Sequence, residues 1–395
     1  MDTRSPIGSR SSTVWLDADS ASFEKFTEIV STRTDHGEWP LATEISRNIP
    51  VYDGTMAREA ASDRGARRAL TAEWNAVFAH GPGIIVIKGA MEHTDVVDRA
   101  TNVFEGLIRV EKEKGLGSGD HFAKPGANDR VWNAMEKHCL ADPENFVRYY
   151  ASDAIALASE AWLGHGYQVT SQVNRVNPGG TAQKPHRDYH LGFMTADQIA
   201  RYPAQAHALS PSLTLQGAIA HCDMPIESGP TMLLPYSQRY FEGYLAFGRS
   251  EFQAFFAEHH VQLPLEKGDA VFFNPAVMHG AGTNRSKDIY RMANLLQVSS
   301  AFGRAIETVN RHRVSQSMYP ALQDAQAGLS QTEIANVIAA SAEGYAFPTN
   351  LDSDPPVGGL TPKTQADLVR EALAAGDPPE TLNMALAALS ARREA

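Results

Sequence analysis

The chain has few cysteines and no concentrated positive charge. Only Cys139 and Cys222 occur among its 395 residues, which excludes a disulfide framework and a four-cysteine zinc or iron–sulfur site. Two scattered thiols are typical of a reducing cytosol, so we expect a cytoplasmic protein. Lys and Arg total 35 against 46 Asp and Glu, a net charge of −11, and no Lys/Arg-rich run occurs. Because such a protein repels phosphate backbones, no nucleic-acid partner is expected.

Long hydrophobic runs are also absent. The most apolar stretch, at residues 83–87, has the length of a strand and falls far short of the ~18 residues of a membrane span. Residues 1–16 are polar and lack the apolar region of a signal peptide, so no membrane partner is expected. The chain contains no Gly-x-Ser-x-Gly elbow of a serine hydrolase and no phosphate-binding loop. With 43% hydrophobic and 21% charged residues, it is expected to be globular.

Hydrophobic periodicity divides the chain into three parts. Residues 1–60 are expected to form an N-terminal extension, residues 61–308 the main domain and residues 309–395 a helical C-terminal extension. Periodicity or composition predicts helices in the ranges 57–80, 96–114, 143–163, 237–258, 332–342, 364–375 and 381–393, and a partly helical insertion at 195–208. The C-terminal helices would form a cap, a homodimer surface or a tail.

The middle of the chain has a different pattern. A buried strand is expected at residues 84–87, and later segments are short, often alternating and separated by Gly, Pro, Asn or Asp. These later segments are 167–176, 213–221, 231–234, 261–265, 270–273 and 289–298. Several short strands in succession predict a β-sandwich or barrel.

One part of this strand-rich region carries candidate metal ligands. His186 and Asp188 are two residues apart, so a strand would point both side chains to the same face. His279, in a His-Gly-Ala-Gly-x-Asn sequence, is the candidate third ligand. Two histidines and one carboxylate leave three metal positions open, as in non-haem Fe(II) oxygenases. The open positions can hold a bidentate cosubstrate and O2.

A charged residue follows at a position expected to be buried. Arg291 lies in an apolar, strand-like stretch after His279. An unpaired Arg inside a buried strand is costly. A dicarboxylate cosubstrate would remove that cost through a bidentate, charge-assisted pair with the guanidinium. Arg285, in the preceding polar turn, is the alternative residue for this role and is expected to be solvated.

The order of these motifs resembles the phytanoyl-CoA dioxygenase (PhyH) family of Fe(II)/2-oxoglutarate-dependent oxygenases. The shared order is His-x-Asp, Gly-Pro-Thr with Leu-Leu-Pro-Tyr-Ser, Gly-Asp, His-Gly-Ala-Gly-x-Asn and a distal Arg. The resemblance implies an α+β fold with a mainly β core, a double-stranded β-helix (jelly roll, cupin-like) flanked by helices. It implies that His186, Asp188 and His279 are the catalytic iron ligands, and that Arg291 binds the far carboxylate of 2-oxoglutarate.

The resemblance also indicates the surroundings of the cosubstrate. Family members often carry Gln or Asn on the strand before the His-x-Asp motif, and Gln172 and Asn174 fill that place. Thr214 or Gln216 is expected to line the same pocket. Fe(II) is the implied cofactor, 2-oxoglutarate and O2 are the implied cosubstrates, and ascorbate is a supporting reductant.

Several residues have competing interpretations. His221 and Asp223 form a second His-x-Asp pair, but this pair lacks the preceding Asn-Pro-Gly turn, so His221 is expected in a pocket wall or a loop hydrogen bond. His190 is expected either to pack or to contact the substrate. The remaining candidate substrate contacts, each also compatible with a structural role, are His121, Arg130, Trp132, Tyr189 and Tyr236.

The implied function is a dioxygenase that hydroxylates an unactivated C–H bond of a small-molecule metabolite, with release of succinate and CO2. Desaturation, epimerisation or cyclisation would need the same residues. A cupin-like metal enzyme that does not use 2-oxoglutarate, or a degenerate jelly-roll binding module, is the alternative. Arg291 separates these hypotheses, because only 2-oxoglutarate dependence gives it a task.

Overall fold

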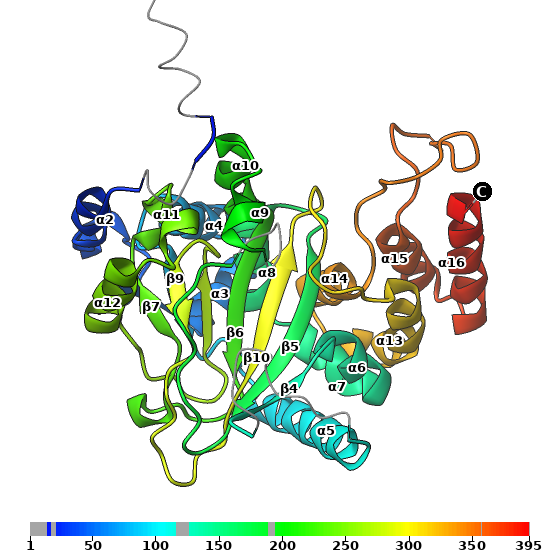
Figure 1. Cartoon of the computed structure of the whole chain (residues 1–395). Helices are drawn as coiled ribbons and strands as arrows, with labels where there is room; N and C mark the ends of the chain where they lie inside the picture. The colour runs from blue at the N-terminus through cyan, green and yellow to red at the C-terminus, as the bar shows by residue number, and fades with distance from the viewer. Residues whose placement is uncertain (1–13, 17–20, 116–125, 189–193, 357, 395) are drawn as a thin grey trace, which may run out of the picture.

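The computed structural model describes residues 14–16, 21–115, 126–188, 194–356 and 358–394. Strands β5, β6 and β10 lie at the centre of the molecule, and the C-terminal helices form a group at one side (Figure 1). None of the helices in the described ranges has the length and hydropathy of a transmembrane segment.

The core is built on an eight-stranded sheet with the order β1-β2-β3-β8-β6-β10-β5-β4. Its strands are β1 (Glu44–Ser46), β2 (Ile49–Asp53), β3 (Ile84–Lys88), β4 (Asn128–Val131), β5 (Gln168–Val176), β6 (Thr214–Ala220), β8 (Ala270–Phe273) and β10 (Arg291–Ser299). Neighbouring strands are antiparallel except for β2 and β3, which are parallel. Residues 44–53, within the predicted N-terminal extension, therefore contribute two strands to the main sheet.

A smaller sheet consists of β7 (Met232–Leu234) and β9 (Met278–Gly280). Isolated bridges extend it on both sides, from His279 to His186 and from Leu233 to Val261. From β5 to β10 the chain passes repeatedly between the large and the small sheet, so that each sheet is assembled from segments distant in sequence. This crossing pattern confirms the predicted double-stranded β-helix with flanking helices.

The side chains of the central strand β10 separate into two faces, because side chains alternate along a strand. Arg291, Ala293 and Gln297 line a cavity between the two sheets. Met292 and Val298 belong instead to the large apolar cluster under the helices. One face of the sheet therefore carries the polar interior, and the other provides the packing surface that stabilises it.

Helices cover the outer face of the large sheet, and their apolar side chains form one cluster with the outward residues of the strands. These helices and those at the sheet edges are α2 (Phe23–Val30), α3 (Gly54–Ser62), α4 (Arg64–Ala79), α5 (Thr94–Glu113), α6 (Ala134–Ala141), α7 (Pro143–Tyr150), α8 (Asp153–Leu163), α9 (Ala196–Ile199), α10 (Ala204–Leu209), α11 (Gly243–Ala246), α12 (Ser250–His259), α13 (Arg311–Ala325), α14 (Gln331–Ser341), α15 (Gln365–Ala375) and α16 (Pro379–Glu394). Short 3-10 helices are η1 (His36–Glu38), η2 (Ser210–Leu213), η3 (Ile226–Ser228), η4 (Ser237–Arg239) and η5 (Gln326–Gly328).

Four predicted elements differ from the structure for local reasons. The helix predicted over residues 143–163 is two helices, α7 and α8, because the Ser152 hydroxyl accepts a hydrogen bond from the Ile155 amide (3.5 Å) and starts α8. The helix predicted over residues 57–80 is two helices, because the Asp63 carboxylate accepts a hydrogen bond from the Ala66 amide (2.7 Å) and starts α4. The helix predicted over 237–258 is divided into η4, α11 and α12. The strand predicted at 261–265 makes only isolated bridges at its two ends. Pro264 lies between those ends and has no amide hydrogen to donate to a ladder.

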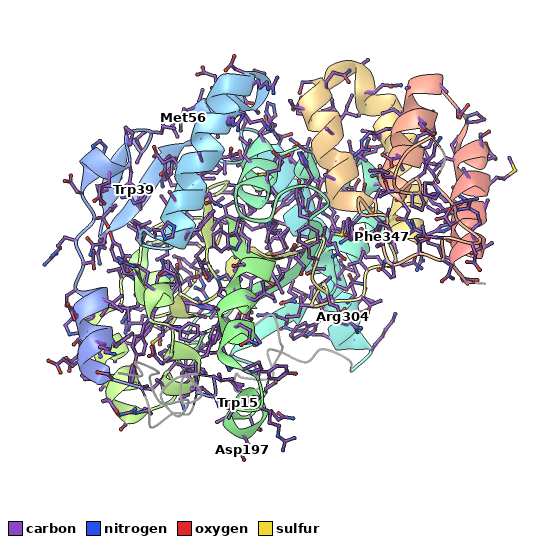
Figure 2. All side chains as sticks on the ribbon, turned by 90° about the horizontal axis from the view of Figure 1, so that it is seen from above. Trp15, Trp39, Met56, Asp197, Arg304 and Phe347 are labelled. Atoms are coloured by element: carbon purple, nitrogen blue, oxygen red, sulfur yellow. The ribbon has the colours of Figure 1, made fainter. Side chains whose placement is uncertain are left out.

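The described part of the N-terminus lies against the segment that precedes α10. Trp15 bridges Pro203, and the Ala204 amide donates to the Val14 carbonyl (2.8 Å). Figure 2 shows Trp15 on the same side of the molecule as Asp197, which belongs to α9. The N-terminal residues thus contact the insertion between β5 and β6.

The C-terminal helices are anchored to the sheet by a buried arginine. Arg311 on α13 donates to the Val169 carbonyl on β5 (2.8 Å) and to the Ala340 carbonyl on α14 (2.9 Å). Because a buried guanidinium without acceptors would be costly, these bonds fix α13 and α14 against the back of β5. The predicted helical C-terminal extension is therefore packed on the main domain.

A buried polar network joins the end of β6 to the helices. The Nδ1 of His221 contacts the Thr101 hydroxyl (2.8 Å), and its Nε2 contacts the Tyr149 hydroxyl (2.9 Å). The Nε2 of His138 contacts the side-chain oxygen of Asn145 (2.8 Å). Burial lowers the pKa of His221 to about 3 and that of His138 to about 4. Both rings are therefore neutral in the folded protein at neutral pH.

We expect the free energy of unfolding to decrease as the pH falls below about 6.5, because the unfolded chain then protonates His221 and His138 while the folded chain does not. Each histidine should add a slope of about 1.4 kcal/mol per pH unit in the window between its unfolded and folded pKa values. Urea unfolding at several pH values measures this slope. His138→Gln should reduce it, and the exposed His165→Gln control should not; an equal slope in all three proteins would contradict the assignment.

Candidate metal centre

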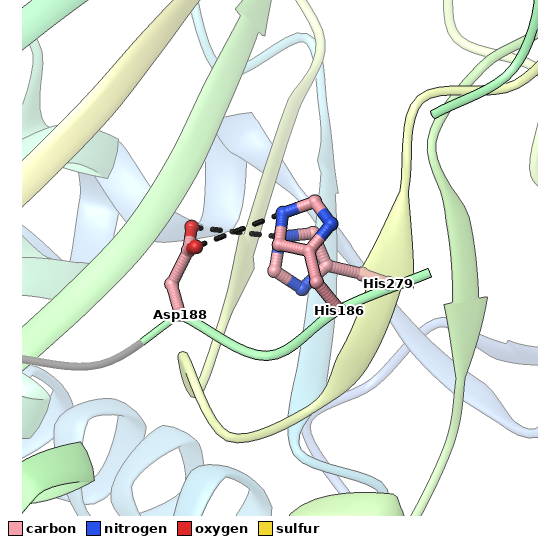
Figure 3. A group of neighbouring side chains, drawn as sticks. All are labelled: His186, Asp188 and His279. Carbon is pink, nitrogen blue, oxygen red and sulfur yellow. Dashed lines mark ion pairs between the residues drawn. The ribbon is translucent and has the colours of Figure 1, made fainter. Parts of the chain in front are cut away.

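Three side chains from two distant segments meet between the sheets (Figure 3). His186 and His279 form a bridge in which each backbone amide donates to the other residue's carbonyl (2.9 Å each). The Asp188 carboxylate lies beside both rings, with Oδ1 3.6 Å from His186 Nε2 and Oδ2 3.7 Å from His279 Nε2. The sequence had indicated a strand at residues 186–188, but the structure has no regular strand there. The bridge nevertheless brings His186 and Asp188 to one side, as predicted.

Both histidines are oriented by carbonyl groups two residues before them. His186 Nδ1 lies 2.9 Å from the Lys184 carbonyl, and His279 Nδ1 lies 2.9 Å from the Val277 carbonyl. A carbonyl can only accept, so Nδ1 carries the proton and the lone pair of Nε2 remains on the side of Asp188. Burial also lowers the pKa of His279, which favours the neutral ring that binds a metal.

Asp188 is held at both its carboxylate and its backbone. The Gln216 side-chain amide donates to Oδ2, and the Asp188 amide donates to the Pro275 carbonyl (3.1 Å). Burial raises the pKa of the Asp188 carboxyl, but the two histidines and Gln216 lower it more, so that its pKa lies below the usual range. The carboxylate is therefore ionised at neutral pH, as metal binding requires.

The donor set fits a divalent metal of intermediate softness. The candidate ligand atoms of His186, Asp188 and His279 all lie within 4.8 Å of one another. Two imidazole nitrogens and one carboxylate oxygen on one side match the facial triad of non-haem Fe(II) enzymes. Within the described ranges, no other group of three His, Cys, Asp or Glu side chains is arranged this way.

A buried arginine lies in the cavity that reaches this triad. This small cavity has a volume of ≈ 130 Å³ and is lined by all three candidate ligands and by Arg291 at the start of β10. Arg291 donates to the Gly229 carbonyl, and no carboxylate of the described residues forms an ion pair with it. Burial lowers the pKa of Arg291 to about 10, so it stays charged at neutral pH. A buried, charged guanidinium facing a cavity favours an anionic ligand.

The residues predicted to surround the cosubstrate have different positions. Gln172 and Asn174 on β5 both line the small cavity, next to each other on the inward face. Thr214 does not line this cavity; it lies at the beginning of β6 and lines a neighbouring, larger cavity. Gln216, two residues further along the same face of β6, lines the small cavity and contacts Asp188.

Arg130 and Trp132, named as candidate substrate contacts, also line the small cavity. The Arg130 guanidinium stacks over the Trp132 ring, 4.9 Å from its centroid, and donates to the side-chain oxygen of Gln172 (2.8 Å). Its charge also contributes to the lowered pKa of Asp188. Two arginines, Arg130 and Arg291, therefore line the small cavity. Arg291 lies on β10, in the segment that the sequence predicted to be a strand.

The larger cavity has a volume of ≈ 740 Å³ and lies on the other side of the triad. It shares Gln183, His186, Asp188, Gln297 and Ile306 with the small cavity. The candidate metal centre is therefore at the junction of the two spaces. Apolar side chains, amides and hydroxyls line the larger cavity together with the cationic side chains of Lys184, Arg187 and Arg304.

Several alternative candidates lie elsewhere. Both ring nitrogens of His221 are used by Thr101 and Tyr149 on the helix side of the sheet, so His221 and Asp223 are not a ligand pair. Arg285 is exposed and lines neither cavity. The Tyr236 hydroxyl contacts Thr34 rather than a cavity. His121, Tyr189 and His190 lie outside the described residues.

Gln297 and Tyr244 are among the lining residues that the sequence reasoning missed. Gln297 is six residues after Arg291 and therefore on the same face of β10, so the alternation of that strand could have identified it. Tyr244 lines the larger cavity from α11, in a segment that was predicted to be one continuous helix. No sequence signal separated Tyr244 from the other aromatic residues of that segment.

Comparisons with known proteins agree with this geometry. The model of the phytanoyl-CoA dioxygenase (PhyH) family matches residues 67–293. The curated protein "Dioxygenase aneA" of Aspergillus aculeatus is 28% identical over 156 residues, 39% of this chain and 48% of that protein. "Dioxygenase trt7" of Aspergillus terreus is 24% identical over 245 residues, 60% of this chain and 76% of that protein. The chain thus aligns with about half the length of the first relative.

Solved structures with weak similarity include an enzyme described as dependent on α-ketoglutarate (2-oxoglutarate) and a protein solved with 2-oxoglutarate bound. The α-ketoglutarate-dependent epimerase SnoN from nogalamycin biosynthesis is 20% identical, with a TM-score of 0.41 over 59% of this chain and 84% of that one. HygX from Streptomyces hygroscopicus, solved with nickel and 2-oxoglutarate, is 13% identical, with a TM-score of 0.38 over 60% of this chain and 90% of that one.

The family match agrees with the enzyme class predicted from the sequence, an Fe(II)/2-oxoglutarate-dependent dioxygenase, and with the names of both curated relatives. The matched residues 67–293 contain all three candidate metal ligands and Arg291. They also make up more than half of the 395 residues. The chain therefore belongs to the phytanoyl-CoA dioxygenase (PhyH) family.

Proposed function

We propose that the protein is a non-haem Fe(II)- and 2-oxoglutarate-dependent dioxygenase that hydroxylates an unactivated C–H bond of a small organic molecule. The observation that carries this proposal is the pairing of two features in one cavity. The His186–Asp188–His279 triad and the buried, charged Arg291 both line the small cavity. A metal enzyme without a dicarboxylate cosubstrate would give that buried charge no counterpart.

The chain's own residues have distinct roles in this proposal. His186, Asp188 and His279 would hold Fe(II) through the two Nε2 atoms and the carboxylate. Arg291 would bind the far carboxylate of 2-oxoglutarate through charge-assisted hydrogen bonds. Gln172 and Asn174 line the small cavity and would contact the same cosubstrate. With O2, these groups supply oxidation of a C–H bond together with release of succinate and CO2.

The larger cavity would receive the substrate. Its volume of ≈ 740 Å³ is in the range that suits a drug-sized organic molecule. Met194, Ile199, Phe247 and Ile306 provide apolar surface, and Asp188 is the only carboxylate among the described lining residues. With that carboxylate used as a metal ligand, the lining offers no counter-charge for a cation. We therefore expect a neutral or anionic substrate with a substantial apolar body.

Thr214 would contact the substrate rather than 2-oxoglutarate, because it lines the larger cavity. Gln216 would instead orient Asp188, since its amide donates to the carboxylate. Replacing the outer hydrogen-bond partners of metal ligands typically reduces metal affinity about 10- to 100-fold. Of these two β6 residues, Thr214 is thus assigned to substrate contact and Gln216 to orientation of a metal ligand.

Anaerobic titration of the metal-free protein with Fe(II) tests the proposal. In the presence of 2-oxoglutarate, we expect the weak visible charge-transfer absorption of an Fe(II)–2-oxoglutarate chelate, and neither component alone should produce it. His279→Ala should abolish the absorption, while the exposed His165→Ala control should retain it. Iron binding without this absorption would favour a cupin-like enzyme that does not use 2-oxoglutarate, and absence of iron binding would favour a binding module.

Arg291 provides a second test, with Arg285 as its matched control. Arg291→Ala should weaken 2-oxoglutarate binding by about 10- to 100-fold, because hydrogen bonds to charged groups are worth about 1.5–3 kcal/mol. Arg291→Lys keeps the charge but loses the planar fork, so it should be intermediate. Arg285→Ala should bind like the wild type, since Arg285 is exposed on the neighbouring turn. The chelate absorption followed during 2-oxoglutarate titration gives the dissociation constants, and weaker binding in Arg285→Ala alone would contradict the assignment.

A further inference from the structure

One short segment contacts both parts of the chain that carry the candidate metal ligands. It runs from Ser237 to Phe247 and includes η4 and α11; we call it the 237–247 segment. The Ser237 hydroxyl accepts a hydrogen bond from the Met278 amide (2.7 Å), directly before His279. The Ser237 carbonyl accepts one from the Arg187 guanidinium, between His186 and Asp188. The segment thus joins the two ligand-bearing parts of the chain at a point outside the triad.

Arg187 fixes this segment through its backbone. Its guanidinium also donates to the Tyr240 carbonyl (3.0 Å) and lies over the Tyr244 ring, 5.5 Å from the ring centroid. A Cβ atom at Gly243 would overlap the Arg187 guanidinium, so the close approach depends on glycine at this position. Arg187 is buried, and its stem leaves the chain between the two ligands of the His-x-Asp motif.

Tyr244 connects the same segment to a metal ligand. Its hydroxyl donates to the Asp188 backbone carbonyl (3.3 Å), while the Asp188 amide donates to the Pro275 carbonyl (3.1 Å). The backbone of Asp188 is therefore held from two directions. The Tyr244 ring is also part of the wall of the larger cavity, together with Phe247 from the end of the same segment.

We propose that Tyr244, held by Arg187, is a positioning residue that aligns Asp188 for metal binding and ties that alignment to the wall of the larger cavity. This proposal rests on the proposed function, because it assumes that Asp188 is a metal ligand. The connection is short, because the Tyr244 ring forms part of the cavity wall and its hydroxyl is hydrogen-bonded to the backbone carbonyl of Asp188, the residue that carries the ligand carboxylate. By linkage, a molecule seated against the ring and a metal at the triad would influence each other's affinity by the same factor.

Tyr244→Phe removes the hydroxyl and keeps the ring, so it tests the hydrogen bond alone. Co(II) is a suitable probe, because its visible spectrum reports ligand geometry as well as occupancy. We expect about tenfold weaker Co(II) binding and an altered spectrum, as for other residues that orient metal ligands. The melting temperature of the metal-free protein should be close to that of the wild type.

Tyr240→Phe is the matched control. Tyr240 lies in the same segment, but its ring packs against Phe26 and Phe252 and does not line the larger cavity. Tyr240→Phe should bind Co(II) with wild-type affinity and spectrum. Gly243→Ala is a second variant, because it displaces Arg187 without touching a ligand, and it should weaken Co(II) binding in the same direction as Tyr244→Phe.

The outcomes separate this inference from the function it rests on. If the wild type binds Co(II) and Tyr244→Phe matches it in affinity and spectrum, the positioning role is wrong while the proposed function stands. Equal weakening in Tyr240→Phe and Tyr244→Phe would also overturn it, because the effect would then be a general loosening of the segment. If the wild type itself does not bind Co(II), both the proposed function and the positioning role fail.

Discussion

The site depends on the register of β10 between β5 and β6. Gln297 on β10 is aligned with Thr170 on β5 and Gln216 on β6, and Ala293 is aligned with Asn174 on β5. Side chains aligned across an antiparallel sheet share a face, so this register gathers the polar groups of three strands on the inner side. A slip of one residue would turn the polar face into the helix-covered core. The apolar outer face of β10 opposes such a slip, because its residues are packed against the helices.

The ligand set and Arg291 were accessible to sequence reasoning through local patterns. His186 and Asp188 are related by an interval of two, and His279 and Arg291 lie in recognisable motifs of a known family, so local patterns and order were sufficient. The placement of these residues around one cavity matches those expectations. Their roles in binding iron and 2-oxoglutarate remain predictions.

Other features depended on information that a single sequence does not carry. Thr214 and Gln216 are two residues apart on β6, so their side chains point to the same face of the sheet. Their positions along the strand decide which of them reaches the small cavity, and the pairing of β6 with β10 sets those positions. The contacts of Tyr244 arise from tertiary packing of the 237–247 segment against Arg187. The break between the two helices in residues 57–80 did have a local signal, because Asp63 is a typical helix N-cap residue. The sequence prediction followed the continuous hydrophobic periodicity and missed this signal.

The bridge between His186 and His279 joins residues separated by 93 positions, from 186 to 279. Such a contact closes a long loop, and the entropy of that closure must be offset before the contact stabilises anything. The ligand set therefore cannot assemble before residue 279 has been synthesised, because no shorter N-terminal part of the chain carries all three side chains. Its geometry requires β9 to be in place in the small sheet, because His279 lies on β9. A metal bound at the proposed site would therefore stabilise the folded chain, in which the three ligands meet, relative to any state in which they are apart.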